Sequence, residues 1–425
     1  MYQAESSGTL LRTKAATARG RGMRVSRNVV VLGTVSLLTD VASEMVAAIL
    51  PIYVVFALGG SPLQYGMVDG IYQGATAILR LVGGFIADRR RRYKEVATVG
   101  YGISAACKAA LVAFGSSISA LGAIVLVDRA GKGVRTAPRD ALIALSSAPQ
   151  ALATAFGVHR AMDTAGAMLG PLVAFGLLLL APARFDAIFV VSTCFAVLGL
   201  AVLVLLADGR PDRDRPQTAS ERATPQERPS LREAAALLGR RRFRTLTLAA
   251  GVLAATTISD GFVYLGLQRT LDVPLTAFPL LFVGSAAAFM VLAVPAGRLA
   301  DRVGRQRVFL GGHLLLVVVY LTLLLPAGGL PVLVLALVAL GGYYAATDGV
   351  LQAIASSFLP DRLRASGLAL LVTATSIAKL ASSVVFGLLW TVTSLDAATM
   401  AFGAALLVAL AFAIWTLRRT PELAT

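Results

Sequence analysis

Ionisable side chains interrupt several long apolar runs of this 425-residue sequence. The first run, roughly residues 29–58, contains Asp40 and Glu44, and a spacing of four places both carboxylates on one face of a helix. A charge at membrane depth is costly unless it is paired or faces a wet cavity. In a cavity of low dielectric a carboxylate tends to hold its proton, and a nearby cation has the opposite effect. The two residues are therefore candidates for binding and releasing a proton.

Other apolar runs also carry charges. The run at about 118–138 is unusually charged and contains Asp128, Arg129, Lys132 and Arg135. The remaining carboxylates and cations of interest are Asp163, Asp260, Asp348, Arg80, Lys108, Arg160 and Lys379. The hypothesis is that Asp40 or Glu44 carries the proton and that Arg129 adjusts its affinity; a static lattice of ion pairs between helices is the alternative. The proton-coupling candidates are Asp40, Glu44, Arg129, Asp260 and Asp348.

Aromatic and polar side chains in two later runs could form the walls of a substrate pocket, and core packing explains them equally well. With the cations, the candidates for a substrate cavity are Lys132, Tyr264, Gln268, Tyr343, Tyr344, Gln352 and Lys379. His159 could titrate near neutral pH or bind a soft metal with Met162, but a histidine hydrogen-bonded between helices is the preferred interpretation. The sequence has no paired metal-ligand motif and no nucleophile–base constellation, so we expect no metal site, no cofactor and no enzyme.

The elements that position these residues are predicted to be membrane helices. Hydrophobic residues make up 57% of the chain, charged residues 15%, and the mean hydropathy is +0.76. This is more apolar surface than a soluble core could bury. Runs of about 20 residues favour helices over a barrel, so the predicted fold class is an all-α membrane protein. The net charge of +16 lies mainly in short segments between runs, which indicates membrane topology and not a nucleic-acid partner.

Twelve spans fit the sequence. Their approximate ranges are 29–58, 63–88, 94–115, 118–138, 154–181, 184–208, 245–268, 276–299, 307–326, 330–353, 366–390 and 394–417. The predicted organisation is a basic tail 1–28, a six-helix half 29–208, a linker 209–244, a second six-helix half 245–418 and a tail 419–425. Arginines crowd one set of loops, so the positive-inside rule places both tails and the linker in the cytoplasm.

An internal duplication supports two similar halves. The segment Gly297 to Arg307 reads GRLADRVGRQR, and Gly84 to Lys94 reads GFIADRRRRYK, 213 residues earlier. Repetition at half the chain length indicates two membrane halves in tandem. Two six-span halves of the same orientation predict parallel pseudo-repeats about an axis along the membrane normal, with a central site between them.

With this repeat the sequence resembles the major facilitator superfamily, whose loop motif is Gly-x-x-x-Asp-Arg-x-Gly-Arg-x-Arg. The matching residues are Gly84, Asp88 and Arg89 in the first copy and Gly297, Asp301, Arg302, Gly304 and Arg305 in the second. The first copy departs from the motif because Arg91 stands where glycine is usual. The resemblance implies a cytoplasmic latch that breaks and reforms as the halves rock. Topogenic charge alone is the weaker alternative, because it would not need this order of residues twice.

Two further motifs carry the resemblance. In span five the pattern Gly-x8-Gly-x3-Gly-Pro, associated with antiporters of this superfamily, is matched by Gly157, Gly166, Gly170 and Pro171. In span four Arg129 and Gly133 match an Arg-x-x-x-Gly core linked in the family to proton transfer. The resemblance implies export by antiport, with spans one, four, seven and ten lining the central cavity. A close-packed helix pair without directional meaning is the alternative for span five.

The expected function is therefore a secondary transporter of the inner (plasma) membrane, exporting a small molecule in exchange for protons by alternating access. The expected partners are a small-molecule substrate, protons and the lipid bilayer, with no nucleic acid, and the protein is expected to be monomeric. A proton-coupled importer (symporter) and a membrane receptor or lipid-binding scaffold without transport are the alternatives. Acidic residues would suit a cationic drug or a divalent metal, and basic residues would suit an organic acid or a siderophore, so the substrate stays open.

Overall fold

The computed structural model describes residues 25–75, 92–148, 151–209, 233, 236–325, 329–360 and 363–418, with the side chain of residue 365 left out. Within these ranges the regular structure is entirely helical. The predicted latch residues Gly84, Asp88 and Arg89 lie outside the described residues, as does Arg80.

The helices of the first half follow the predicted spans closely. They are α1 (Arg27–Ile52), which continues as the π-helix η1 (Tyr53–Ala57), the helix 62–75, α3 (Tyr93–Phe114), α4 (Ile118–Leu145), α5 (Leu152–Leu180) and α6 (Phe185–Leu206). The main difference is α4, which extends past the predicted end near residue 138. Its additional turns contain Arg139 and Asp140, whose side chains pair with each other at 2.9 Å, so the charges that end the apolar run do not end the helix.

The helices of the second half begin after a short 3₁₀ turn η3 (Leu237–Gly239). They are α9 (Arg241–Ala255), α10 (Asp260–Leu271), α11 (Pro279–Val303), α12 (Arg305–Leu323), α13 (Gly329–Ser356), α14 (Arg364–Val392) and α15 (Leu395–Arg418). Ten helical stretches of the described part of the chain are long and apolar enough to cross a membrane, with α9 and α10 counted as one. Charged α4 and the helix 62–75, followed only to residue 75, complete the twelve predicted spans.

The seventh span is interrupted between α9 and α10. The freed backbone groups are bonded by side chains of neighbouring helices: the Tyr320 hydroxyl donates to the Thr256 carbonyl at 2.8 Å and accepts from the Ile258 N–H at 2.8 Å. Ser382 Oγ donates to the Thr257 carbonyl at 2.6 Å. Irregular backbone is tolerated in a membrane only where such partners are available.

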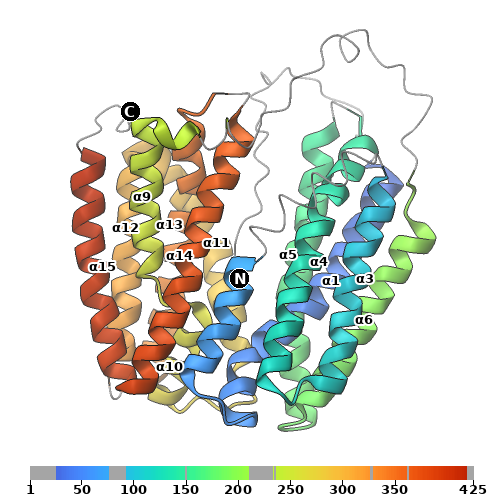
Figure 1. Ribbon diagram of the computed structural model, residues 1–425, viewed down its shortest axis with the longest axis horizontal. Helices are drawn as coiled ribbons and strands as arrows, with labels where there is room; N and C mark the ends of the chain where they lie inside the picture. Colours follow the sequence, from blue (N-terminus) through green and yellow to red (C-terminus); the bar gives the residue numbers. More distant parts are fainter. Residues whose placement is uncertain are drawn as a thin grey trace.

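The helices form two bundles, with α1 to α6 in one and α9 to α15 in the other (Figure 1). Within the first bundle α1 packs against α5 and α6, and α3 packs against α4; within the second, α13 packs against α11 and α12. The last residue of α6 and the first residue of α9 lie at the same end of the molecule, the top in Figure 1, which we call the linker end. The other end is the opposite end.

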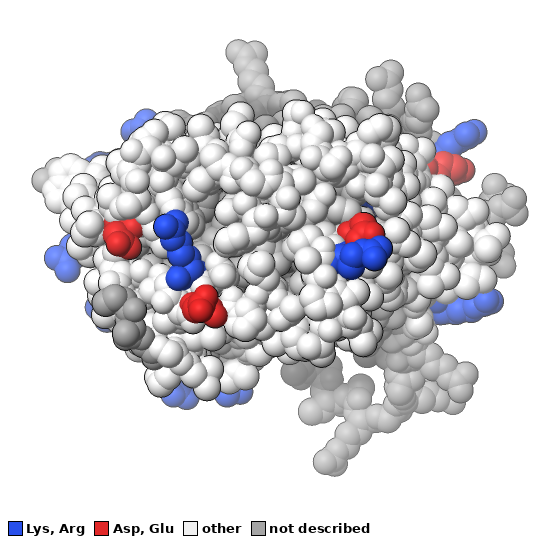
Figure 2. All heavy atoms as spheres, turned by 90° about the horizontal axis from the view of Figure 1, so that it is seen from below, with Lys and Arg blue, Asp and Glu red and all other residues white. Residues whose placement is uncertain are grey.

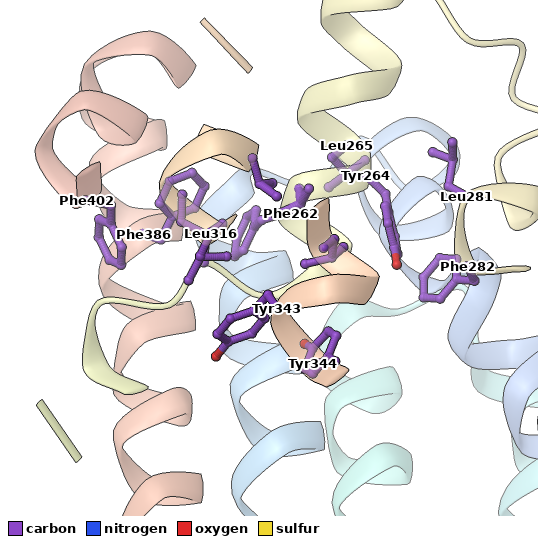
Figure 3. Packing of buried hydrophobic residues seen from close by; sticks show 14 of the residues in the cluster. Phe262, Tyr264, Leu265, Leu281, Phe282, Leu316, Tyr343, Tyr344, Phe386 and Phe402 are labelled. Atoms are coloured by element: carbon purple, nitrogen blue, oxygen red, sulfur yellow. The ribbon is translucent and has the colours of Figure 1, made fainter. Parts of the chain in front are cut away.

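The two halves contact each other at the opposite end. The Leu63 N–H donates to Thr391 Oγ1 at 2.9 Å, and the rings of Tyr65 and Phe262 meet edge to face at 4.8 Å. Phe262 in turn packs against Phe386 at 4.9 Å, so the contact continues into the aromatic core of the second half (Figure 3). The helix 62–75 begins and α14 ends in this region. This conformation is therefore closed at the opposite end.

Charge differs between the two ends of the molecule. Seen from below in Figure 1, the opposite end shows few charged side chains on a largely uncharged face (Figure 2). One of its charged features is the exposed ion pair of Arg184 and Asp186, at 2.8 Å. At the linker end, by contrast, α9 begins with Arg241, α12 begins with Arg305 and α15 ends with Arg418. Basic residues therefore gather at the linker end, the end that the positive-inside rule assigned to the cytoplasm.

Candidate functional site

A buried cluster of ionisable groups joins α3, α4 and the helix 62–75. Asp128 of α4 pairs with Lys108 of α3 at 3.1 Å and with the adjacent Arg129 at 2.7 Å. The Arg129 guanidinium lies over the Tyr72 ring, 4.1 Å from its centroid, in a cation–π contact. We call Tyr72, Lys108, Asp128 and Arg129 the central cluster. Two cations and one carboxylate leave it with a formal excess of one positive charge.

The central cluster borders a small cavity that contains unsatisfied polar groups. Its wall includes Ser43 of α1 and the four cluster residues. Ser43 Oγ and Arg129 Nε are buried and have no hydrogen-bond partner among the described residues, and the same holds for Glu44 Oε2. Since buried polar groups are normally paired, these groups are suited to bind water or a ligand.

A second cluster lies nearer the linker end, between α1, α4 and α5. The carboxyl groups of Asp40 of α1 and Asp163 of α5 lie close enough for each to act on the charge of the other. Asp163 also faces Arg139 at 3.9 Å and Arg160 at 3.6 Å. Two neighbouring carboxyl groups disfavour each other's charge, which favours a proton on one of them, so this pair is suited to hold a proton.

Ser36 connects the carboxyl pair to other groups of the same half. Its Oγ lies 2.9 Å from His159 Nε2, 3.4 Å from the Tyr101 hydroxyl and 3.4 Å from Arg139 Nη1. His159 therefore takes the interhelical hydrogen bond that the sequence favoured for it. Among the described residues no group of three or more His, Cys, Asp or Glu side chains is arranged to hold a metal ion.

Several proton-coupling and substrate-cavity candidates of the second half lie around Tyr344 of α13. Its hydroxyl donates to Asp260 Oδ1 at 2.6 Å, and Lys379 Nζ lies 5.8 Å from the centroid of its ring. Asp348, one turn further along α13, has a buried Oδ2 without a hydrogen-bond partner in the described part of the chain. The structure thus brings Asp260, Tyr344 and Lys379 together.

Asp69 of the helix 62–75 bridges the two halves and was not among the predicted site residues. Ser383 Oγ of α14 donates to Asp69 Oδ2 at 2.6 Å, and the Tyr65 hydroxyl donates to Oδ1 at 3.4 Å. Asp69 also lines a second cavity together with Asp260, which belongs to the other half. The predicted Asp260 and the unpredicted Asp69 therefore line the same cavity.

Several predicted substrate-cavity residues have packing roles in this conformation. Tyr264 is buried between Phe278 and Phe282, and its hydroxyl is hydrogen-bonded to Ser285. Gln268 Nε2 donates to the Val273 carbonyl at 3.3 Å, where α10 ends.

Tyr343 stacks edge to face on His313 and contacts Tyr344 (Figure 3). Lys132 and Gln352 are half-buried, on α4 and α13. Of the aromatic residues predicted to line a substrate pocket, Tyr344 is the one whose described contacts are with charged groups, Asp260 and Lys379.

Two of the three motif glycines in span five lie where α5 meets α1. A Cβ on Gly166 would lie 2.4 Å from the Leu37 carbonyl oxygen, and one on Gly170 would lie 2.8 Å from Glu44 Cβ. Gly157 faces open space, and Pro171 is buried within α5. The motif thus brings α5 against the helix face that carries Asp40 and Glu44.

The second latch motif is exposed at the linker end. Asp301 pairs with Arg305 at 3.3 Å, and Arg305 Nη1 also donates to the Ala353 carbonyl at 3.4 Å. Gly304 has φ +108°, which favours glycine and explains its place between α11 and α12. Gly297 has nothing near its Cβ position, and Arg302 is exposed. In this conformation the motif makes its contacts within its own half.

A helical membrane protein with two bundles, buried ionisable groups in each of them and a closed contact at one end has the architecture of an alternating-access transporter. Residues 32–290 and 252–425 match the Major Facilitator Superfamily. The chain belongs to this superfamily, and it is a transporter and not an enzyme.

Similar proteins agree with this assignment. An uncharacterized MFS-type transporter of Methanocaldococcus jannaschii is 29% identical over 373 residues, covering 86% of this chain and 89% of the relative. A mutant of the nucleoside transporter NupG matches with a TM-score of 0.76 at 15% identity, over 91% of this chain and 99% of the other.

A bacterial homologue of the human lysosomal transporter Spinster, in an inward-facing and unoccupied conformation, matches with a TM-score of 0.72 at 15% identity, over 93% and 98% of the two chains. At such identity these structural matches show the fold alone.

Proposed function

We propose that this transporter exports a small molecule from the cytoplasm in exchange for protons. The observation that supports proton coupling most directly is the buried pairing of the carboxyl groups of Asp40 and Asp163. One proton bound between two carboxyl groups is released when a new positive charge or better hydration stabilises both ionised forms. Arg139 and Arg160 already face Asp163. Their positive charges favour the ionised form of Asp163 and so assist release of the shared proton.

The location of the pair is consistent with alternating access. Asp40 and Asp163 belong to the same half, so rocking of the two halves leaves the pair together and changes its access to water and the charges of the facing half. The halves contact at the opposite end, which leaves the linker end as the side of entry in this conformation. With the linker end in the cytoplasm, as the basic residues favour, substrate enters from the cytoplasm.

The proposal includes a membrane, a topology and an oligomeric state. We place the protein in the inner (plasma) membrane as a multi-pass monomer with both termini cytoplasmic, and we extend the latch role to Asp88 and Asp301. The span-five motif supports export because Gly166 and Gly170 hold α5 against the carboxylate face of α1. A symporter would use the same proton site, so the direction of proton movement is the property to measure.

The test uses purified protein in sealed liposomes with the pH dye pyranine inside and the membrane potential clamped. Amino acids, primary amines, organic acids, cationic dyes and divalent metals are added outside one at a time. Antiport predicts that a transported compound makes the interior more alkaline, because protons leave as the compound enters. Acidification would show symport, and compounds that bind without any pH change or uptake would show a receptor.

Variants assign the proton site. Asp40→Asn and Asp163→Asn are each expected to abolish the pH change, because an amide cannot release the shared proton. Asp186→Asn is the matched control, since Asp186 is exposed and paired only with Arg184 at the opposite end. Normal proton movement in both Asp40→Asn and Asp163→Asn would refute the proposed site.

A further inference from the structure

Two adjacent cavities lie on either side of Tyr72. One is bordered by Asp69 and Asp260, and the other by the central cluster and Ser43. Both have Ala47, Leu50 and Tyr72 in their walls, so these three side chains separate them. In this conformation the cavities measure about 30 and 20 Å³, so a ligand lying along the Tyr72 ring would reach both only as the site widens.

The two cavities differ in charge. The first has two carboxylates, Asp69 from one half and Asp260 from the other, and its wall contains no cation among the described residues. Lys379 stands beyond Tyr344, over the ring of that residue, and is not part of the wall. The cavity also presents Tyr65, Tyr72 and Phe282, whose ring faces attract a cation.

The second cavity offers donors. Lys108 and Arg129 outnumber the single carboxylate Asp128, and the unsatisfied Arg129 Nε–H and Ser43 hydroxyl are both buried at its wall. Ser43 is 3% exposed and Arg129 is 4% exposed, so bulk water does not supply their missing partners. Glu44 Oε2, the nearby acceptor that also lacks a partner among the described residues, is not part of this wall, so the donors of the wall favour a ligand that carries an anionic group.

We infer that the substrate is a small zwitterion with a primary amino group and an acidic group. The ammonium group lies between Asp69 and Asp260, and the acidic group accepts hydrogen bonds from Ser43, Arg129 Nε and Lys108. This inference rests on the proposed function, because it concerns the transport site. It accounts for the presence of both signs of charge, which left the substrate class open at the level of sequence.

Simpler ions fit less well. A pure cation would leave the donors around Ser43 without an acceptor, and a pure anion would face Asp69 and Asp260 across Tyr72. A zwitterion satisfies both ends and adds no net charge to a site of low dielectric, where uncompensated charge is costly.

Binding at Asp69 also has a consequence for movement. Asp69 holds Ser383 of the other half by a hydrogen bond of 2.6 Å. An ammonium group next to Asp69 competes for the same carboxylate oxygens and weakens this tie between the halves. Occupancy of the site is thereby coupled to opening at the opposite end.

The test is equilibrium binding to the purified protein in detergent, using sets of three compounds on one carbon skeleton. Each set contains an amino acid, the amine that lacks its carboxylate and the acid that lacks its amino group. At least one amino acid is expected to bind tenfold or more tightly than both of its counterparts. Asp69→Asn should weaken its binding about 10- to 100-fold, to the level of the acid, and Lys108→Met should weaken it to the level of the amine.

Asp260→Asn, in the other half, provides a second test of the amine end should Asp69→Asn fold poorly, and Arg184→Gln is the control for loss of an exposed charge. An amine that binds as well as its amino acid, an acid that does so, or sets in which nothing binds would each overturn the zwitterion. The two proposals can fail separately. If a dye or a metal moves protons in the liposome assay, antiport is supported but the zwitterionic substrate class is refuted.

Discussion

Ser383→Ala tests whether the hydrogen bond to Asp69 holds the halves together at the opposite end. The bond is 2.6 Å long, buried, and joins residues 314 positions apart. A hydrogen bond to a charged group contributes about 1.5–3 kcal/mol, so its loss should lower the ratio of closed to open opposite ends about 10- to 150-fold. Ser192→Ala is the matched control, because the buried Ser192 hydroxyl donates a bond of 2.7 Å to the Ala42 carbonyl within one half.

The assay is electron–electron distance measurement between spin labels. Labels at Ser116 and Ser394, which are exposed in loops of the two halves at the opposite end, report their separation in a background where Cys107 and Cys194 are replaced. Ser383→Ala should increase the population of long distances, and Ser192→Ala should leave the distribution unchanged while lowering thermal stability. Identical distributions in Ser383→Ala and the parent protein would show that other contacts hold this end closed.

Three further predictions concern stability in detergent, measured by thermal unfolding. Gly166→Ala should destabilise the protein by about 1–3 kcal/mol because the new methyl group collides with the backbone of α1, whereas Gly157→Ala, in open space, should cost nothing; equal effects would refute the packing argument. Asp128→Asn should cost about 3–5 kcal/mol because it leaves buried cations without a carboxylate, and adding Lys108→Met should recover part of this loss; no recovery would contradict the ion-pair account. Gly304→Ala should cost about 1–3 kcal/mol, since φ is +108° there, and an unchanged unfolding temperature would show that the turn can rearrange.

The fold could be predicted because its signals are local or repeated. Apolar runs of spanning length predict helices whatever their neighbours, and the repeated loop motif relates the halves without any knowledge of contacts. The helix of span four continues to Leu145, past the predicted end of that span near residue 138. Arg139 and Asp140 pair with each other, so the helix continues.

The site was only partly predictable. Asp40, Glu44 and Arg129 were identified because a charge in an apolar run is conspicuous by itself. Asp69 is such a residue too, within the predicted span 63–88, and the same criterion would have found it. Its tie to Ser383 joins distant parts of the chain, and such a contact leaves no trace in a single sequence.

The sequence also does not show how each helix is rotated about its own axis, and this rotation decides which side chains face the cavity. Tyr264 was a candidate wall residue, but its hydroxyl is bonded to Ser285 inside the second half. The residues of α10 from Asp260 to Leu267 are all buried, so no contrast between a buried and an exposed face shows which side meets the cavity. The same uncertainty applies to Tyr343, which packs on His313.

The break between α9 and α10 has a mechanical consequence. Tyr320 and Ser382 fasten residues 256–258 to α12 and α14, so the break has a fixed pivot. Beyond it lies α10, only 12 residues long, which begins with Asp260 and rests on the first half where Tyr65 approaches Gly261. Swivelling this short segment about its pivot displaces far less mass than turning a whole bundle. We therefore expect α10 to yield first when the opposite end opens, ahead of the larger rotation.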